Sequence, residues 1–206
     1  MLSSADPDPS HRRYSSVAIL LHWTIAILIV VNIIVALNAD ELKGLAKFSQ
    51  LQWHKSFGLT VLMLTVLRFL WRLLNPPPAY PVHMARWEKS AATATHLGFY
   101  LLTLAIPLTG WIMVSASPLN IPTLLFKTIP WPHIGFVHSL PMIQRKGLEG
   151  SLTAVHQLLA WGTLVLLALH VAAALKHQFR DRDWILWGMI PLPVLKPGSA
   201  KQTEVR

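Results

Sequence analysis

The 206-residue chain contains no cysteine, and its four long apolar segments contain no aspartate or glutamate. The lack of cysteine excludes disulfides, cysteine-ligated iron–sulfur clusters and haem attached through a Cys-x-x-Cys-His motif. The lack of acidic side chains argues against zinc, because zinc sites need three or four ligands and usually recruit cysteine or carboxylate. It also argues against a metal or proton transporter, which would use intramembrane carboxylates.

Charged residues are scarce as well. They make up 13% of the chain, hydrophobic residues make up 53%, and the mean hydropathy is +0.45. Four segments are long enough to cross a hydrocarbon core of about 30 Å as helices: 17–37, 53–74, 91–116 and 152–175. We predict an all-α integral membrane four-helix bundle over residues 17–190, with a polar tail at 1–16 and a flexible tail at 191–206.

The basic residues predict the orientation. About twice as many lysines and arginines fall on the side of the termini and the 75–90 connection as on the other side, which places both termini in the cytoplasm by the positive-inside rule. The net charge of +9 then indicates attraction to the anionic lipid of the bilayer. No compact basic motif with interleaved aromatics is present, which argues against nucleic acid as a partner.

Two histidines share one face of the last segment. His156 and His170 are fourteen residues apart, so on a helix they project in similar directions, roughly 21 Å apart along the axis. Imidazole is the commonest metal ligand and is costly to bury in lipid without a partner. The spacing predicts two buried metal centres stacked across the membrane. The alternative is ordinary packing with a hydrogen bond between helices.

The depth of each histidine limits the pairing. In the outer half of the membrane only His54 can pair with His156, whereas the inner half offers His22, His96 and His170. Two imidazoles on facing helices are enough for the iron of haem b, whereas zinc would need more ligands. The sequence therefore predicts haem rather than zinc.

Two arginines accompany the inner histidines. Arg68 and Arg72 follow His54 by fourteen and eighteen residues, so the three share a helix face that ends at the cytoplasmic side. Guanidinium binds carboxylates in a bidentate manner. We predict that Arg68 first, and then Arg72, binds the propionates of an inner haem. The alternative is that both side chains reach out to the lipid headgroups.

Several motifs together resemble the bacterial di-haem cytochrome b561 family over roughly residues 12–190. They occur in the order Arg13-Tyr14-Ser15, Leu21-His22-Trp23, His54-Lys55-Ser56-Phe57-Gly58, Leu67-Arg68, His96-Leu97-Gly98-Phe99-Tyr100, Pro107-Leu108-Thr109-Gly110-Trp111, His156 and His170-Val171-Ala172-Ala173-Ala174-Leu175-Lys176-His177. The resemblance implies two haem b groups, with His22 and His170 as the inner axial ligands and His54 and His156 as the outer ones. His96 would be spare, as a hydrogen-bonding partner of a propionate or a quinone, or as an interior side chain.

The resemblance also implies the function. The expected protein is a multi-pass protein of the bacterial cytoplasmic (inner) membrane. It would transfer single electrons between the quinone pool, such as ubiquinone, and a periplasmic redox partner. It would be an electron carrier or an oxidoreductase. One such oxidoreductase would oxidise superoxide and use quinone as the electron acceptor. The alternative is a membrane-anchor and electron-relay subunit of a hydrogenase or dehydrogenase. A homo-oligomer is compatible with either role.

The remaining connection and histidines complete the expectations. We predict that residues 117–151 lie at the outer interface as short irregular or helical pieces, either shaping a quinone or electron-donor site or covering the outer haem. His177 is expected at the interface. The tail and loop histidines are expected to be solvated: His11, His83, His133 and His138.

Overall fold

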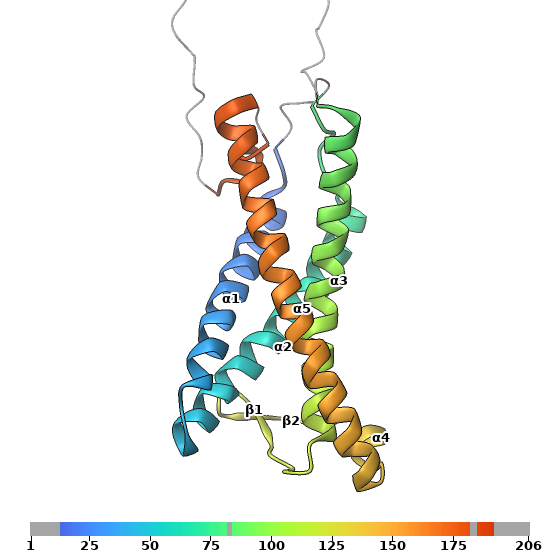
Figure 1. The fold of residues 1–206 in the computed structure, drawn as a ribbon. Helices are drawn as coiled ribbons and strands as arrows, with labels where there is room; N and C mark the ends of the chain where they lie inside the picture. The colour runs from blue at the N-terminus through green and yellow to red at the C-terminus, as the bar shows by residue number, and fades with distance from the viewer. Residues whose placement is uncertain (1–12, 82–83, 182–184, 192–206) are drawn as a thin grey trace, which may run out of the picture.

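The computed structural model describes residues 13–81, 84–181 and 185–191, and four long helices dominate it (Figure 1). Each helix is long and apolar enough to cross a membrane. They are α1 (Ser16–Asp40), α2 (Gly44–Leu74), α3 (Arg86–Ala116) and α5 (Met142–Lys176). The predicted all-α bundle of four membrane-spanning helices is confirmed. The predicted tails at 1–16 and 191–206 lie almost wholly outside the described residues, as do His11 and His83.

The helices are longer than the predicted spans. The α2 helix starts at Gly44 rather than at residue 53, and α5 starts at Met142 rather than at 152. The predicted limits came from charged residues, but a helix satisfies its own backbone hydrogen bonds and can continue into the polar interface. The helix ends follow local chemistry: the Ser15 hydroxyl accepts a hydrogen bond from Ala18 N at 3.3 Å, and α2 stops at the run of prolines 76–78, which cannot continue it.

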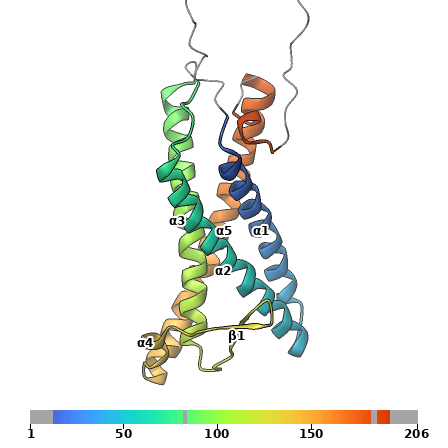
Figure 2. The same ribbon diagram turned by 180° about the vertical axis from the view of Figure 1, so that it is seen from behind.

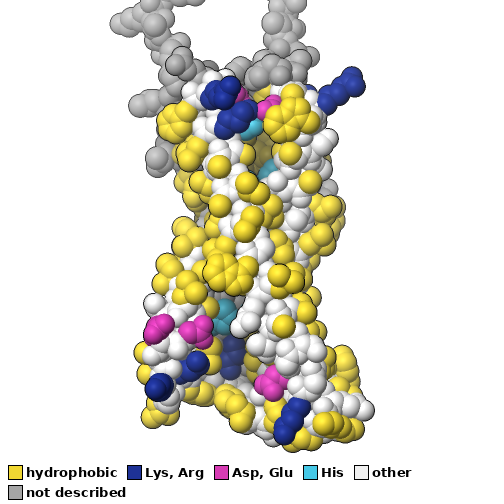
Figure 3. Space-filling view, viewed as in Figure 1, with side chains coloured by type: hydrophobic (Ala, Val, Ile, Leu, Met, Phe, Trp, Pro, Cys, Tyr) yellow, Lys and Arg dark blue, Asp and Glu magenta, His cyan; other side chains and the backbone are white. Residues whose placement is uncertain are grey.

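The helices pack as two pairs. α1 packs against α2, α3 packs against α5, and α2 joins the pairs through α3, whereas α1 and α5 make no comparable contact in the described chain (Figures 1 and 2). The space-filling view in Figure 3 shows histidine side chains recessed between helices on this face. The bundle is therefore least closely packed along the line between α1 and α5.

The connection between α3 and α5 contains a β-hairpin, which was not predicted. Strands β1 (Thr123–Leu125) and β2 (Ile129–Trp131) pair antiparallel with Leu124 opposite Pro130, and the short helix α4 (Gly135–His138) follows. The hairpin crosses one end of the bundle, which we call the hairpin end (Figure 1). The prediction of only irregular or helical pieces at 117–151 was wrong, and the last ten residues of that range belong to α5.

Two polar side chains of α2 fix the hairpin in place. The Gln52 amide nitrogen donates to the Pro122 carbonyl at 2.8 Å, and its oxygen accepts from Leu124 N at 2.9 Å. The Ser56 hydroxyl accepts from Phe126 N at 2.8 Å. Both side chains are fully buried, with 1% and 0% exposure. The hairpin is therefore anchored on the two sides of His54 along α2.

Arg145 closes the same end from α5. Its Nε donates to the Ala116 carbonyl at 3.1 Å, and its Nη2 donates to the Ser117 carbonyl and, at 2.7 Å, to Asn120 Oδ1. The carbonyls of Ala116 and Ser117 lie at the C-terminal end of α3, where a cation is favourable. Arg145 is 6% exposed, so it is a buried helix cap rather than a solvated loop cation.

The two loop histidines near Arg145 differ from the expectation. His133 and His138 stack with ring centres 5.0 Å apart and planes at 12°. His138 Nδ1 lies 3.3 Å from the Ser115 carbonyl, and burial followed by the neighbouring His138 lowers the pKa of His133. Both rings are half-buried, so they are less exposed than free loop side chains. Their place in the packed connection explains this.

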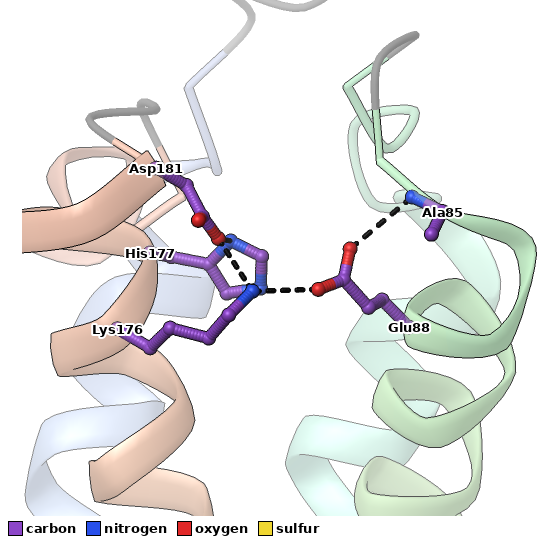
Figure 4. Close-up of polar contacts among 5 residues, drawn as sticks. All are labelled: Ala85, Glu88, Lys176, His177 and Asp181. Atoms are coloured by element: carbon purple, nitrogen blue, oxygen red, sulfur yellow. Dashed lines mark hydrogen bonds and ion pairs between the residues drawn. The ribbon is translucent and has the colours of Figure 1, made fainter.

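Charged side chains join α3 to α5 at the opposite end, which we call the termini end (Figure 4). Lys176 Nζ lies 2.6 Å from Glu88 Oε1 and 2.7 Å from Asp181 Oδ2, and Glu88 also accepts from Ala85 N at 3.1 Å. His177 Nδ1 lies 3.1 Å from Asp181 Oδ2. A π-helical turn (His177–Asp181) follows α5, and a short 3-10 helix (Trp187–Met189) comes later.

Both ends of the described chain lie at the termini end. Trp23 Nε1 donates to the Met189 carbonyl at 2.6 Å, and Arg13 donates to the Ile190 carbonyl. The start of α1 and the segment after α5 are therefore on one side, as four spans require. Cytoplasmic placement of this side stays a prediction from the basic residues.

Candidate functional site

The structure forms two histidine pairs, one near each end of the bundle. His22 on α1 and His170 on α5 have ring centres 6.3 Å apart with planes at 70°. His54 on α2 and His156 on α5 have ring centres 6.1 Å apart with planes at 78°. Each pair joins the α1–α2 pair of helices to α5. The four predicted ligand residues therefore meet two by two.

The separations match one metal between two rings. An imidazole nitrogen binds a first-row metal at about 2 Å and lies roughly 1.1 Å from its ring centre, so two opposed imidazoles on one metal have centres about 6.2 Å apart. Among the described residues no group of three or more His, Cys, Asp or Glu side chains is arranged to hold a metal. The geometry of each pair fits a group held by two imidazoles, such as haem iron.

Hydrogen bonds set the tautomers of the pair at the hairpin end. The Thr109 hydroxyl donates to the Ile106 carbonyl at 2.8 Å and lies 3.1 Å from His156 Nδ1, so its oxygen accepts a hydrogen bond from the Nδ1–H group. His54 Nδ1 lies 3.4 Å from the Asn32 carbonyl, which can only accept. Both rings then carry hydrogen on Nδ1 and keep the lone pair of Nε2 for a metal. Partners of this kind orient metal-binding histidines.

A glycine gives His156 its room. A Cβ added at Gly110 would lie 3.2 Å from His156 Cε1, which is closer than ordinary contact. Glycine at this position therefore lets α3 approach the ring, and the adjacent Thr109 can reach its nitrogen. The sequence alone indicates no role for Thr109, because which residue of α3 faces His156 depends on packing between the helices.

Three histidines gather near the termini end. His170 has His22 at 6.3 Å, His96 at 6.0 Å and Phe99 at 5.3 Å between ring centres. His96 Nδ1 is buried and has no hydrogen-bond partner in the described chain. The structure therefore keeps the three inner candidates together. Choosing His22 as the partner of His170 rests on the family resemblance.

Arg68 and Arg72 line a cavity between α1, α2 and α3. The cavity is small and open to solvent, and its other lining residues are Tyr14, Ala18, Trp71, Asn75, Pro77, Tyr100 and Met189. The guanidinium carbons lie 5.9 and 6.0 Å from the Tyr100 ring centre. Among the described residues neither arginine forms an ion pair with a carboxylate.

Arg68 and Arg72 are half-buried, and a cation that is partly removed from water is stabilised by a carboxylate, so two arginines without an acid suit an anion from outside the chain. Tyr14, just before α1, adds a hydroxyl to the cavity. Burial raises the pKa of Tyr14 although Arg72 acts to lower it, so the phenol is neutral at neutral pH and can donate a hydrogen bond. The cavity therefore has the donor set that a carboxylate would need.

Comparisons with known proteins agree with this geometry. Residues 13–192 match the family described as prokaryotic cytochrome b561. Cytochrome b561 homolog 2 of Escherichia coli (strain K12) is 29% identical over 181 residues, covering 86% of this chain and 91% of that protein. The probable superoxide oxidase CybB of Yersinia pestis is 29% identical over 185 residues, covering 88% and 97%. Cytochrome b561 homolog 1 of Escherichia coli (strain K12) is 25% identical over 188 residues, covering 87% and 97%.

The family match spans most of the chain, and it includes all four long helices and all four paired histidines. The membrane-spanning helices and the histidine pairs are what a b-type haem in a bacterial membrane requires. The chain thus belongs to the prokaryotic cytochrome b561 family and is a bacterial membrane cytochrome of the b type.

Proposed function

We propose that the protein binds two haem b groups and transfers single electrons across the bacterial inner membrane. The observation that carries the proposal is the presence of two histidine pairs, each at the separation expected for one metal between them. His156 and His170 lie roughly 21 Å apart along α5. This arrangement gives one electron site near each side of the membrane.

The proposed ligands are His22 with His170 and His54 with His156. Two imidazoles would hold each haem iron and would leave no open position for oxygen or peroxide chemistry, which favours electron transfer. When bound, haem supplies a one-electron couple within reach of both membrane faces. The chain positions the rings and fixes the tautomers at the hairpin end.

Arg68 and Arg72 would bind the propionates of the haem at the termini end. Their cavity offers two cations without an acidic partner. We expect Arg68→Ala to lower the midpoint potential of that haem, because loss of a nearby positive charge stabilises the oxidised state. A redox titration measures this. An unchanged midpoint would instead place Arg68 at the lipid headgroups.

The proposed electron acceptor is quinone in the bilayer, and the proposed donor is superoxide or another periplasmic redox partner. One relative with 29% identity is named a probable superoxide oxidase, which supports superoxide. The termini would face the cytoplasm, so the hairpin end would face the donor. The connection at 117–131, anchored beside His54, would then form the donor-facing surface.

The decisive experiment measures haem content and electron flow in the purified protein. Pyridine haemochrome analysis should give two haem b per chain, with low-spin spectra. Superoxide should reduce ubiquinone only when the protein is present. One haem per chain or a high-spin native spectrum would contradict the bis-histidine sites. Copurification of a large hydrogenase or dehydrogenase subunit, without superoxide-dependent quinone reduction, would favour the relay role.

A further inference from the structure

His96 lies against a proposed ligand without a role in the proposed function. It projects from α3, its ring centre is 6.0 Å from that of His170, and the ring planes meet at 66°. Its Nδ1 is buried without a hydrogen-bond partner in the described chain. A buried nitrogen without a partner is unfavourable. The position therefore calls for a group that His96 can bond.

The hairpin end shows what such a group does. There α3 places Thr109 against His156, and the hydroxyl oxygen accepts a hydrogen bond from the Nδ1–H group. His96 precedes Thr109 by thirteen residues on α3, and His170 follows His156 by fourteen on α5. Because α3 and α5 pack side by side in opposite directions, His96 and Thr109 occupy equivalent positions relative to the two α5 histidines.

We propose that His96 is a positioning residue that accepts a hydrogen bond from His170 Nδ1, as Thr109 does for His156. The proposal rests on the proposed function only in taking His170 as an axial ligand. His96 would fix the tautomer and the angle of the His170 ring. In this arrangement α3 binds no metal itself but orients both ligands of α5.

The distance is close to what this bond requires. A direct N–H···N bond of about 2.9 Å between two imidazoles places their centres about 5.2 Å apart. The observed distance between ring centres is 6.0 Å. A small rotation of either side chain would bring the two nitrogens within hydrogen-bonding distance. Phe99 also contacts His170, but it has no acceptor atom. Of the two α3 side chains whose rings contact His170, only His96 can accept a hydrogen bond from its Nδ1–H group.

The bond has an electronic consequence. An acceptor at Nδ1 makes the ligand nitrogen more basic and strengthens its binding to oxidised iron more than to reduced iron. Removing the acceptor should therefore raise the midpoint potential of the haem at the termini end. A tenfold loss of the preference for oxidised iron corresponds to about 59 mV for a one-electron couple. This sign is opposite to that expected for Arg68→Ala.

The test compares four variants of the full-length protein. His96→Leu removes the acceptor, and His96→Asn replaces it with an amide oxygen near the position of Nδ1. Phe99→Leu changes the packing on His170 without removing an acceptor. Thr109→Val removes the equivalent acceptor at the hairpin end. Redox titration and low-temperature electron paramagnetic resonance report each haem separately, with haem content as the measure of folding.

We expect His96→Leu to raise the potential and shift the low-spin signal of the haem at the termini end alone, and Thr109→Val to do the same at the hairpin end alone. His96→Asn should restore values close to wild type, and Phe99→Leu should leave the potential nearly unchanged. Equal potentials in wild type and His96→Leu, or equal shifts in the Leu and Asn variants, would overturn the proposal.

A high-spin spectrum in His96→Leu would also overturn the proposal, because it would show that His96 is itself a ligand of the iron. The wild-type spectrum separates these failures from a failure of the proposed function. If wild type lacks two low-spin haems, the ligand assignment is wrong. If wild type has them and His96→Leu changes nothing, only the positioning role is wrong.

Discussion

The two ends of the bundle are held by different interactions. At the hairpin end, Gln52, Ser56 and Arg145 bind backbone groups and are at most 6% exposed. At the termini end, Lys176 bridges two carboxylates while its own side chain is 38% exposed. Buried hydrogen bonds of the first kind are costly to break, whereas exposed ion pairs contribute little and weaken in salt.

The two histidine pairs also differ in how firmly the chain holds their rings. At the hairpin end both rings have a hydrogen bond at Nδ1. At the termini end the described chain provides no hydrogen bond to the ring nitrogens of His22 or His170, and His96 stands beside them without a partner. The ring orientations at the hairpin end are therefore fixed by the chain's own hydrogen bonds, whereas those at the termini end are not.

The strongest test of this contrast is His156→Ala. At the hairpin end only His54 remains to bind iron, because the other histidines nearby, His133 and His138, stack on each other in the loop. The haem content should fall from two per chain to one, as measured by pyridine haemochrome. His133→Ala is the control and should retain both. Retention of two haems in His156→Ala would mean that the hairpin-end pair is wrong.

Gly110→Ala tests how tightly that site is built. The new Cβ would lie 3.2 Å from His156 Cε1, so the ring must shift away from Thr109. We expect weaker haem retention at the hairpin end on dilution in detergent, although alanine favours a helix over glycine by about 1 kcal/mol. In Gly162→Ala the Cβ meets nothing within 4 Å, so this control should retain haem like wild type. Equal retention in both variants would contradict the role of Gly110.

Gln52→Leu should release the hairpin. It leaves the Leu124 amide without its partner and the Pro122 carbonyl with Lys55 Nζ alone, at 3.2 Å, and an unsatisfied buried group costs about 1–3 kcal/mol. Limited proteolysis should cut residues 117–131 faster, and the thermal midpoint should fall. Gln50→Leu, two residues earlier on α2, is the matched control because Gln50 makes no hydrogen bond to the hairpin among the described residues. Similar protease sensitivity in both variants would refute the anchor.

Lys176→Met should have the smallest effect. It removes the link between Glu88 and Asp181 at the termini end (Figure 4). We expect a small decrease in the thermal midpoint at low salt that disappears at high salt, since salt screens exposed charges. Lys47→Met, which removes an exposed pair with Asp40 at 3.7 Å, should give a smaller change. A decrease that persists at high salt would show that Lys176 stabilises the protein by something other than exposed ion pairs.

The sequence predicted the parts of the molecule that depend on helix periodicity. The fourteen-residue spacing of His156 and His170 put both on one face of α5, and the order of the spans put His54 at the same depth as His156. These features follow from one helix at a time. Arg68 and Arg72 were predicted to share a face for the same reason, and they line one cavity.

The parts that were missed depend on contacts between distant segments. Gln52 and Ser56 bind residues about seventy positions later, and no local pattern in either segment indicates this. The hairpin turn has positive φ at Phe126 and Lys127, where turn signals would call for glycine or asparagine. Phe126 is held there by contacts with Trp53 and Phe57, which the sequence could not reveal.

Because one uninterrupted helix, α5, carries one histidine of each pair, the number of residues between His156 and His170 sets the distance between the two pairs. One residue inserted between His156 and His170 would turn one ring by about 100° around the axis and move it by about 1.5 Å, so both pairs could not form together. An insertion of seven residues would restore the angle but would lengthen the gap by about 10 Å, beyond what a bilayer accommodates without tilt. The chain between these two histidines is therefore fixed in length, and variation in length has to occur in the connections outside it.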